Sequence, residues 1–189
     1  SIFAELADVL DQINLMTYDL AGAFGDEWVC WHNAALDNGG QTFPSHGGPL
    51  PSAMEDVARF RDAGVPDAQL GIGIDFYGYT WRGGRRRSNP GEGITAPLQS
   101  WVPGAPPDVT DNVPFHELAR RHGLSGDGSR SPLYRWDAVA GAPYLSIDEP
   151  GADADVFVSY DDTRLIRDKI DAVRREGLGG VIIWELGGG

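Results

Sequence analysis

The sequence has almost no cysteine. Cys30 is the single cysteine among 189 residues, so no disulfide can form within the chain and no thiol cluster can hold a metal ion. Stability must therefore come from a packed core. With 41% hydrophobic residues, a chain of 189 residues is long enough for one ordinary domain with such a core.

Long apolar runs and a basic surface are also missing. No apolar stretch approaches the roughly 20 residues of a membrane helix, and the first residues do not resemble a signal peptide. We therefore expect no membrane association, and an export signal, where the parent protein has one, is expected outside this chain. The net charge is −13 and the basic residues cluster only at Arg85–Arg87. Because nucleic acids need a concentrated basic surface, a neutral or weakly cationic polymer is the better partner.

Patterns that hold metals or nucleotide cofactors are absent as well. The histidines show none of the spacings of a metal site, such as two histidines one turn apart on a helix. Gly71 and Gly73 precede Asp75, but this stretch lies inside an expected strand and not between a strand and a helix. We expect neither a metal nor a cofactor.

The apolar pattern alternates between short strands and amphipathic helices. The expected elements are a helix at 2–11, a strand at 13–18, a helix at 52–64, a strand at 70–76, a helix after 161 and a strand at 180–184. Ser52 and Glu55 form a capping box, Asp161 or Asp162 caps the last helix, and Gly177 ends it. Strands separated by helices predict a parallel sheet, and hence the α/β class.

The region between Arg82 and Tyr160 has a different composition, rich in glycine, proline and serine. It contains short β-like pieces at 133–136, 143–147 and 156–160, and a helix is expected after Pro114. We interpret it as an inserted α+β subdomain. The predicted organisation is thus two strands with their connecting helix at 1–81, the insertion at 82–160, and the last helix and strand at 161–189.

Residues 12–19 read Q-I-N-L-M-T-Y-D. They resemble the strand-six signature of family 18 glycoside hydrolases, the chitinases, in which the pattern is Q-x-x-x-M-x-Y-D. Further segments are similar to that family in the same order: 73–78 for strand seven, 157–162 at the end of the insertion, and 179–186 for strand eight. The resemblance implies a partial (β/α)8 TIM barrel, comprising the last three strands and a small α+β insertion subdomain.

The family's strand-four motif, D-x-x-D-x-D-x-E, supplies the proton donor and occurs nowhere in these 189 residues. A complete barrel also needs about 250 residues. The resemblance therefore implies part of a chitinase that hydrolyses β-1,4-linked N-acetylglucosamine polymers by a retaining, substrate-assisted mechanism. Without the catalytic glutamate, the isolated chain is expected to be inactive.

The resemblance assigns site residues as well. Tyr18 and Asp19 carry over as catalytic residues: Tyr18 donates its hydroxyl to the acetamido oxygen of the sugar, and Asp19 supports the reacting geometry. Met16, Tyr77 and Trp184 carry over as substrate-binding residues, with Trp184 as an apolar floor under the sugar. The alternative interpretation of Tyr18 and Asp19 is a buried tyrosine satisfied by a carboxylate at a strand end.

Other aromatic residues extend this prediction along a polysaccharide cleft. Candidate stacking platforms, each of which can instead be a core residue, are Trp28, Trp31, Trp81, Trp101 and Trp136. We select Trp28 and Trp136 as substrate-binding residues. Tyr79 stands where family members commonly have arginine, so one contact to a sugar hydroxyl is in question.

Two other functions stay open beside a chitinase. One is a chitinase-like lectin that binds carbohydrate without cleaving it. The other is a half-barrel assembly fragment without activity, because half of a parallel barrel exposes sheet edges and apolar side chains. The expected partners are chitin or N-acetylglucosamine oligosaccharides, and either the missing N-terminal half-barrel or a second copy of the chain. Because the substrate polymer is extracellular, the parent protein is expected to be secreted.

Overall fold

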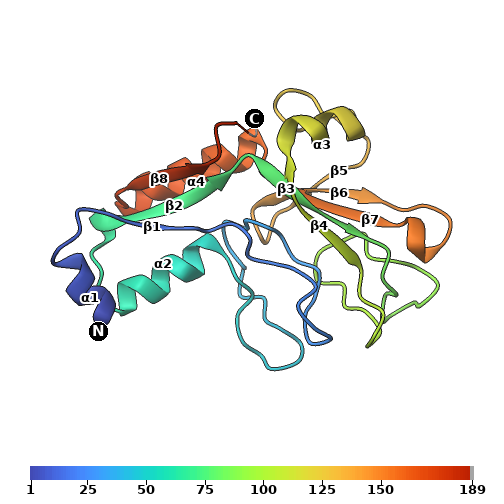
Figure 1. Cartoon of the computed structure of the whole chain (residues 1–189), viewed down its shortest axis with the longest axis horizontal. Helices are drawn as coiled ribbons and strands as arrows, with labels where there is room; N and C mark the ends of the chain where they lie inside the picture. Colours follow the sequence, from blue (N-terminus) through green and yellow to red (C-terminus); the bar gives the residue numbers. More distant parts are fainter. Residues whose placement is uncertain (188–189) are drawn as a thin grey trace.

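The computed structural model describes residues 1–187 and contains two β-sheets that lie next to each other along the molecule (Figure 1). One sheet has three parallel strands and the other has five antiparallel strands. Residues 188 and 189 of the predicted segment 161–189 lie outside the described part. None of the helices in that part is long and apolar enough to cross a membrane.

The parallel sheet has the order β1-β2-β8, with bounds Ile13–Leu15, Leu70–Asp75 and Gly180–Trp184. Its helices are α1 (Ile2–Ala7), α2 (Ala53–Asp62) and α4 (Thr163–Glu176). A short 3-10 helix at Asp67–Gln69 leads into β2. The predicted sequence of strands and helices is confirmed, although the first helix and the first strand are shorter than expected.

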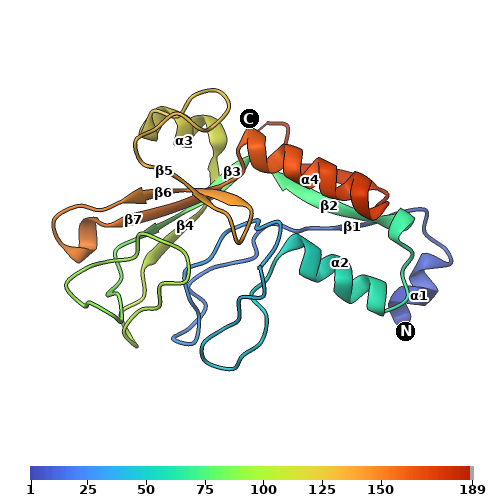
Figure 2. The same cartoon turned by 180° about the vertical axis from the view of Figure 1, so that it is seen from behind.

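Side chains of the parallel sheet divide between two different faces. Leu15, Ile72 and Val181 are register partners on one face, where they form a core cluster with Val57 of α2 and Val173 of α4. Figure 2 shows α4 lying along β2, and α4 contacts both β2 and β8. The opposite face has a glycine at two positions of β2, so that other groups can approach the backbone closely.

The ends of α2 and α4 follow their sequence patterns. The Ser52 hydroxyl accepts the N–H of Glu55 at 3.2 Å and begins α2. The sequence predicted either Asp161 or Asp162 as the N-cap of α4. The N-cap is Asp162, whose side chain accepts the N–H of Leu165 at 2.8 Å. Gly177 ends α4 in the left-handed conformation, with φ of 69°.

The second sheet has the order β4-β3-β7-β6-β5. Its strands are β3 (Tyr77–Arg82), β4 (Asp108–Pro114), β5 (Tyr134–Asp137), β6 (Ala142–Ile147) and β7 (Val156–Tyr160), accompanied by α3 (Phe115–His122) and a 3-10 helix at Ala152–Ala154. The predicted pieces around β5, β6, β7 and α3 are confirmed, whereas β3 and β4 were not predicted as strands. Because β3 pairs with β4 and β7, the second sheet begins at Tyr77, before the predicted boundary at residue 82.

Alternation along β7 shows how both faces of this sheet are buried. Val158 packs with Leu118 of α3 in one cluster, whereas its neighbour Phe157 packs with Trp31 and Trp81 in another. Trp31 belongs to the long connection between β1 and α2, which the sequence predicted as a loop. This connection therefore supplies core side chains to the sheet and brings residues 28–33 toward the end of β1.

Candidate active site

Tyr18 follows β1 and lies against the backbone of β2. The Thr17 hydroxyl accepts the N–H of Gly73 at 2.8 Å and donates to the Gly73 carbonyl at 3.3 Å, so the chain stays attached to β2 after β1 ends. The ring of Tyr18 occupies the space above Gly73, where an added Cβ would lie 2.6 Å from Cδ1 and Cε1. The glycine at residue 73 is therefore what allows the tyrosine ring to lie on the strand.

Asp19 is held at this strand end by two tyrosine hydroxyls and an amide. Tyr77 and Tyr79, both in β3, donate their hydroxyls to Oδ1 of Asp19 at 2.5 and 2.9 Å. The backbone N–H of Asp19 donates to Oδ1 of Asn33 at 3.0 Å. Its φ of 59° is in the left-handed region, which few residues other than glycine, asparagine and aspartate adopt. The surroundings thus fix both the backbone and the carboxylate.

The three tyrosines of this group all keep their protons. Burial is the main cause that raises the pKa of Tyr18, followed by the negative charge of Asp19. Burial and then the hydrogen bond to Asp19 raise the pKa of Tyr77 and of Tyr79. The site consequently presents phenol hydroxyls as hydrogen-bond donors around one carboxylate.

A buried polar cluster supports the site from the end of β2. Asp75, Asp161 and Lys169 are 1%, 5% and 0% exposed. Lys169 Nζ lies 2.5 Å from Oδ2 of Asp161 and 3.9 Å from Oδ1 of Asp75, and Asn33 Nδ2 donates to Oδ2 of Asp75 at 2.5 Å. Burial, followed by the charge of Asp161, raises the pKa of Asp75 well above its ordinary value.

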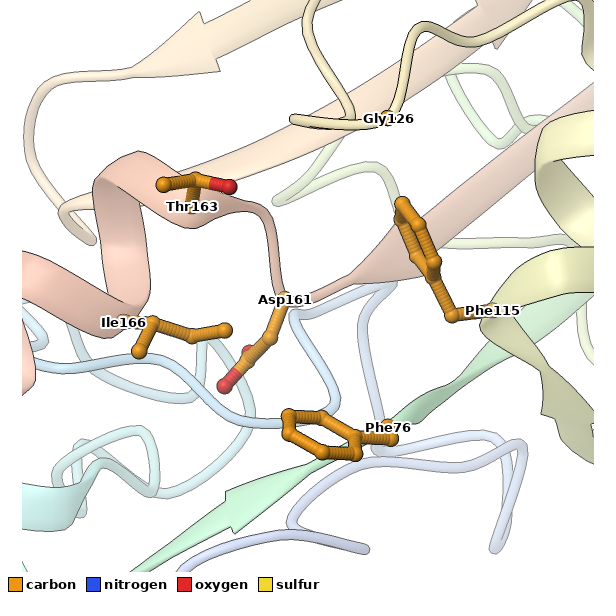
Figure 3. Close-up of a pocket in the computed structure, with 6 residues that line it drawn as sticks. All are labelled: Phe76, Phe115, Gly126, Asp161, Thr163 and Ile166. Carbon is orange, nitrogen blue, oxygen red and sulfur yellow. The ribbon is translucent and has the colours of Figure 1, made fainter. Parts of the chain in front are cut away.

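Asp161 also borders a pocket of about 200 Å³. Figure 3 shows its carboxylate directed between the side chains of Phe76 and Ile166, with Phe115 on the far side of the pocket. The carboxyl group therefore has apolar neighbours on this side, which agrees with the upward shift of its pKa through burial.

The sequence analysis did not select Asn33, Asp75, Asp161 or Lys169 as site residues. One pattern could have found the lysine: Leu165, Lys169 and Ala172 are the buried positions of α4 and share one helical face. Lys169 is also the single lysine of the chain. A lysine on the apolar face of a helix needs a buried acidic partner.

The predicted substrate-binding residues differ greatly in exposure. Met16 and Trp184 are 70% and 53% exposed, and Trp184 lies at the end of β8, opposite Asp75 in the register. Tyr77 is only 5% exposed, so its ring belongs to the core and its hydroxyl is used by Asp19. Met16 and Trp184 thus offer open apolar surface at the ends of the two strands that flank β2, whereas the Tyr77 hydroxyl is hydrogen bonded to Asp19.

Trp28 and Trp136 already have partners within the chain. The ring of Trp28 is half-buried, with its centroid 4.8 Å from that of Phe24 and 4.9 Å from that of Phe43. The guanidinium carbon of Arg164 lies 3.6 Å above the ring of Trp136, so one face of this ring is covered by a cation–π contact. Their binding of a sugar stays a prediction.

Three other tryptophans are core residues, which is the alternative that the sequence left open for them. The exposed fraction is 0% for Trp31, 0% for Trp81 and 1% for Trp101. All three belong to the large core cluster between the antiparallel sheet and the long connection after β1. They fill the interior because a loop without secondary structure that packs on a sheet needs large side chains to exclude water.

Tyr79 connects the site to an open hollow of about 370 Å³. Its walls also contain Phe24, which is 65% exposed, and the carboxylates of Asp108 and Asp111. An exposed ring beside carboxylates can bind the apolar face and the hydroxyls of a sugar. The sequence analysis did not select Phe24. Within residues 1–187, no group of three or more His, Cys, Asp or Glu side chains is arranged to hold a metal ion.

The comparison with protein families identifies the family of the chain. The family model described as "Glycosyl hydrolases family 18" matches residues 2–189. The chain belongs to glycosyl hydrolase family 18. Chitinase A1 of Niallia circulans is 31% identical over 192 residues, and chitinase B of Serratia marcescens is 30% identical over 216 residues. A family 18 N-acetylglucosaminidase from Paenibacillus barengoltzii is similar in structure, with a TM-score of 0.71 and 29% identity.

These relatives are much longer than the chain. The matches cover 98% and 99% of this chain but only 25% of chitinase A1 and 42% of chitinase B. The structural match likewise covers 99% of this chain and 47% of the N-acetylglucosaminidase. The family 18 chain therefore corresponds to part of the relatives that it matches.

Proposed function

We propose that this family 18 chain forms the last three strands of a (β/α)8 barrel that hydrolyses β-1,4-linked N-acetylglucosamine polymers. The order β1-β2-β8 supports this assignment, because the three strands are parallel neighbours and their connecting helices α2 and α4 share one apolar cluster on one face. In the described residues, β1 and β8 each have only one hydrogen-bonded neighbour strand. Both edges are thus available for further strands of a barrel.

The observation that carries the proposal is the arrangement of Tyr18 and Asp19 after a parallel strand. C-terminal strand ends are where barrel enzymes have their active sites. Tyr18 donates its hydroxyl to the acetamido oxygen of the substrate, which attacks the anomeric carbon as the glycosidic bond breaks. Asp19, oriented by Tyr77 and Tyr79, stabilises the positive charge of the resulting oxazolinium ion. This is the retaining, substrate-assisted mechanism, in which no side chain forms a covalent bond to the sugar.

Met16 and Trp184 form the apolar part of the proposed sugar site. Both side chains are largely exposed, Met16 just after β1 and Trp184 at the end of β8, the two strands that flank β2. The apolar face of a pyranose ring can stack on the exposed indole of Trp184, and Met16 offers a flexible thioether that adapts to the same ring. The hollow beside Tyr79 and Phe24 offers room for the next sugar of a chain.

The proton donor in this proposal comes from a part of the barrel that these 189 residues do not include. The motif D-x-x-D-x-D-x-E is absent from the sequence, and Tyr18, with its raised pKa, is too weak an acid for a leaving group. The partners of the chain are therefore N-acetylglucosamine oligosaccharides and the first half of the barrel. Because chitin is an extracellular polymer, we place the whole protein outside the cell.

A direct test measures hydrolysis of N-acetylglucosamine oligosaccharides by the purified chain, alone and mixed with a polypeptide that carries the first five barrel strands. Binding is followed in the same samples through tryptophan fluorescence, because Trp184 is exposed at the site. Turnover only in the mixture supports the proposal. Turnover by the chain alone refutes the assignment of the acid, and binding without turnover in both samples indicates a lectin.

A further inference from the structure

Asn33 is hydrogen bonded through every polar group that it has. Its Oδ1 accepts the Asp19 N–H at 3.0 Å and its Nδ2 donates to Asp75 at 2.5 Å. Its own N–H donates to the Ser159 hydroxyl at 2.8 Å, and its carbonyl accepts the N–H of Leu20 at 2.9 Å. The side chain is 1% exposed, so water does not compete for these bonds.

These bonds determine which way the amide of Asn33 points. The Asp19 N–H can only donate, so it must face the amide oxygen, and the NH2 group must then find an acceptor on the other side. Asp75 is that acceptor. If Asp75 supplied no acceptor, the amide would gain by rotating away from Asp19, because a buried NH2 group without a partner is unfavourable.

The backbone of Asp19 depends on this amide. Two consecutive N–H groups, those of Asp19 and Leu20, end on Asn33, and Asp19 is in the left-handed region with φ of 59°. Such a conformation is unfavourable by itself and persists only where surrounding contacts hold it. The direction of the Asp19 side chain toward Tyr77 and Tyr79 follows from that backbone.

The charges of Asp161 and Lys169 determine the protonation of Asp75. Asp75 and Asp161 share one ammonium group, that of Lys169, and all three are buried. Oδ1 of Asp75 and Oδ1 of Asp161 have no hydrogen-bond partner, although both carboxyl groups approach the same Lys169 Nζ, at 3.9 and 2.5 Å. One retained proton between the carboxyl groups satisfies both oxygens and makes the cluster neutral. Asp75 then donates to Asp161 and accepts from Asn33.

We propose that Asn33 is a positioning residue for Asp19, and that the buried cluster of Asp75, Asp161 and Lys169 fixes its orientation. This inference rests on the proposed function for its effect on turnover, but not for its effect on the geometry of Asp19. It makes Asp75 a neutral hydrogen-bonding group whose charge is not required. An amide at residue 75 can donate to Asp161 and accept from Asn33, whereas a methyl group can do neither.

The test compares four variants of the complete protein: Asn33→Ala, Asp75→Ala, Asp75→Asn and Asn38→Ala. Asn38 is the matched control, since it is a buried asparagine of the same connection, 8% exposed, whose two side-chain bonds go to Leu50 and Gly40 and not to Asp19. Asn33→Ala and Asp75→Ala are expected to lower kcat by about 10- to 100-fold with KM nearly unchanged. Asp75→Asn is expected to keep kcat within about threefold of the wild type.

A second measurement does not depend on hydrolysis. Tyrosinate absorbance is recorded against pH for the same proteins under conditions where circular dichroism shows them folded. Tyr77 and Tyr79 lose their hydrogen bond to Asp19 when Asp19 moves, so part of their raised pKa disappears and their ionisation shifts to lower pH. We expect this shift in Asn33→Ala and Asp75→Ala, and its absence in Asp75→Asn and Asn38→Ala.

The two measurements separate the possible outcomes. If the complete wild-type protein hydrolyses no substrate while the tyrosine shifts follow the expected pattern, the positioning inference holds and the proposed function fails. Equal effects of Asn38→Ala and Asn33→Ala reduce the role of Asn33 to general stability and overturn the inference. It is equally overturned when Asp75→Asn behaves as Asp75→Ala does, because the charge of Asp75 is then required.

Discussion

Replacing Gly73 by alanine tests the arrangement of Tyr18 directly. The added Cβ would lie 2.6 Å from two carbons of the Tyr18 ring and 3.0 Å from the Thr17 nitrogen. Ordinary contact between such carbons is about 3.5–4.0 Å, so the ring must move by about 1 Å. The backbone of β2 is held in place, because Gly73 pairs with Ile182 of β8 and its N–H is hydrogen bonded to the Thr17 hydroxyl. The Tyr18 ring, and not the strand, is therefore displaced.

The expected size follows from this displacement. Overpacking by one methyl group lowers the free energy of unfolding by about 1–3 kcal/mol, and a catalytic group that moves by about 1 Å can lower kcat about 100-fold. Turnover of N-acetylglucosamine oligosaccharides by the complete protein measures kcat, and urea unfolding measures stability. We expect a large loss of kcat in a protein that remains folded.

Gly71→Ala is the matched control for Gly73→Ala. It lies on the same face of the same strand, but its Cβ would meet the flexible side-chain ends of Asn14 and Gln12. These side chains can rotate away, so we expect kcat close to that of the wild type. Normal kcat in a folded Gly73→Ala variant would refute the inference that the position of Tyr18 matters for catalysis.

Three other changes test the site and the core. Tyr18→Phe is expected to lower kcat by about 10²–10³-fold because a donor to the acetamido oxygen is lost. The control Tyr144→Phe, in the insertion, is expected to keep full turnover. Equal rates for both variants contradict the catalytic role of Tyr18. Trp31→Ala is expected to lower the free energy of unfolding by about 3–5 kcal/mol because its side chain is 0% exposed, whereas Trp184→Ala weakens oligosaccharide binding and leaves urea unfolding nearly unchanged. Burial raises the pKa of Asp75 in the folded state. Above the ordinary carboxyl pKa of about 4, residue 75 therefore loses its proton in the unfolded state but keeps it in the folded state. The free energy of unfolding of the wild type then falls by up to about 1.4 kcal/mol per pH unit until the pH exceeds the raised pKa. The Asp75→Asn variant has no titrating group at residue 75, so its free energy of unfolding should rise with pH relative to that of the wild type. If urea unfolding shows the same difference between the two proteins across this pH range, the neutral state of Asp75 is contradicted.

The sequence predicted elements best where local patterns and tertiary structure agree. The helix at 163–176 has a cap, an apolar face and a terminal glycine, and the structure contains it within these limits. The strands β3 and β4 were missed because their partners lie far along the chain: Trp81 pairs with Val109 on one side and with Phe157 on the other. β4 also has four exposed residues, so it lacks the apolar alternation that identifies a strand.

The sequence alone determined the α/β class and the family resemblance, and it selected Tyr18 and Asp19 as candidate catalytic residues, because a short run of residue types in fixed order carries that information. Only the tertiary structure decided which side chains surround them. Asn33, Asp75, Asp161 and Lys169 meet through hydrogen bonds and ion pairs between residues that are distant in the chain. The structure also separated buried Trp31, Trp81 and Trp101 from exposed Trp184. The burial of an aromatic residue depends on what packs against it, and a single sequence does not contain that arrangement as a local pattern.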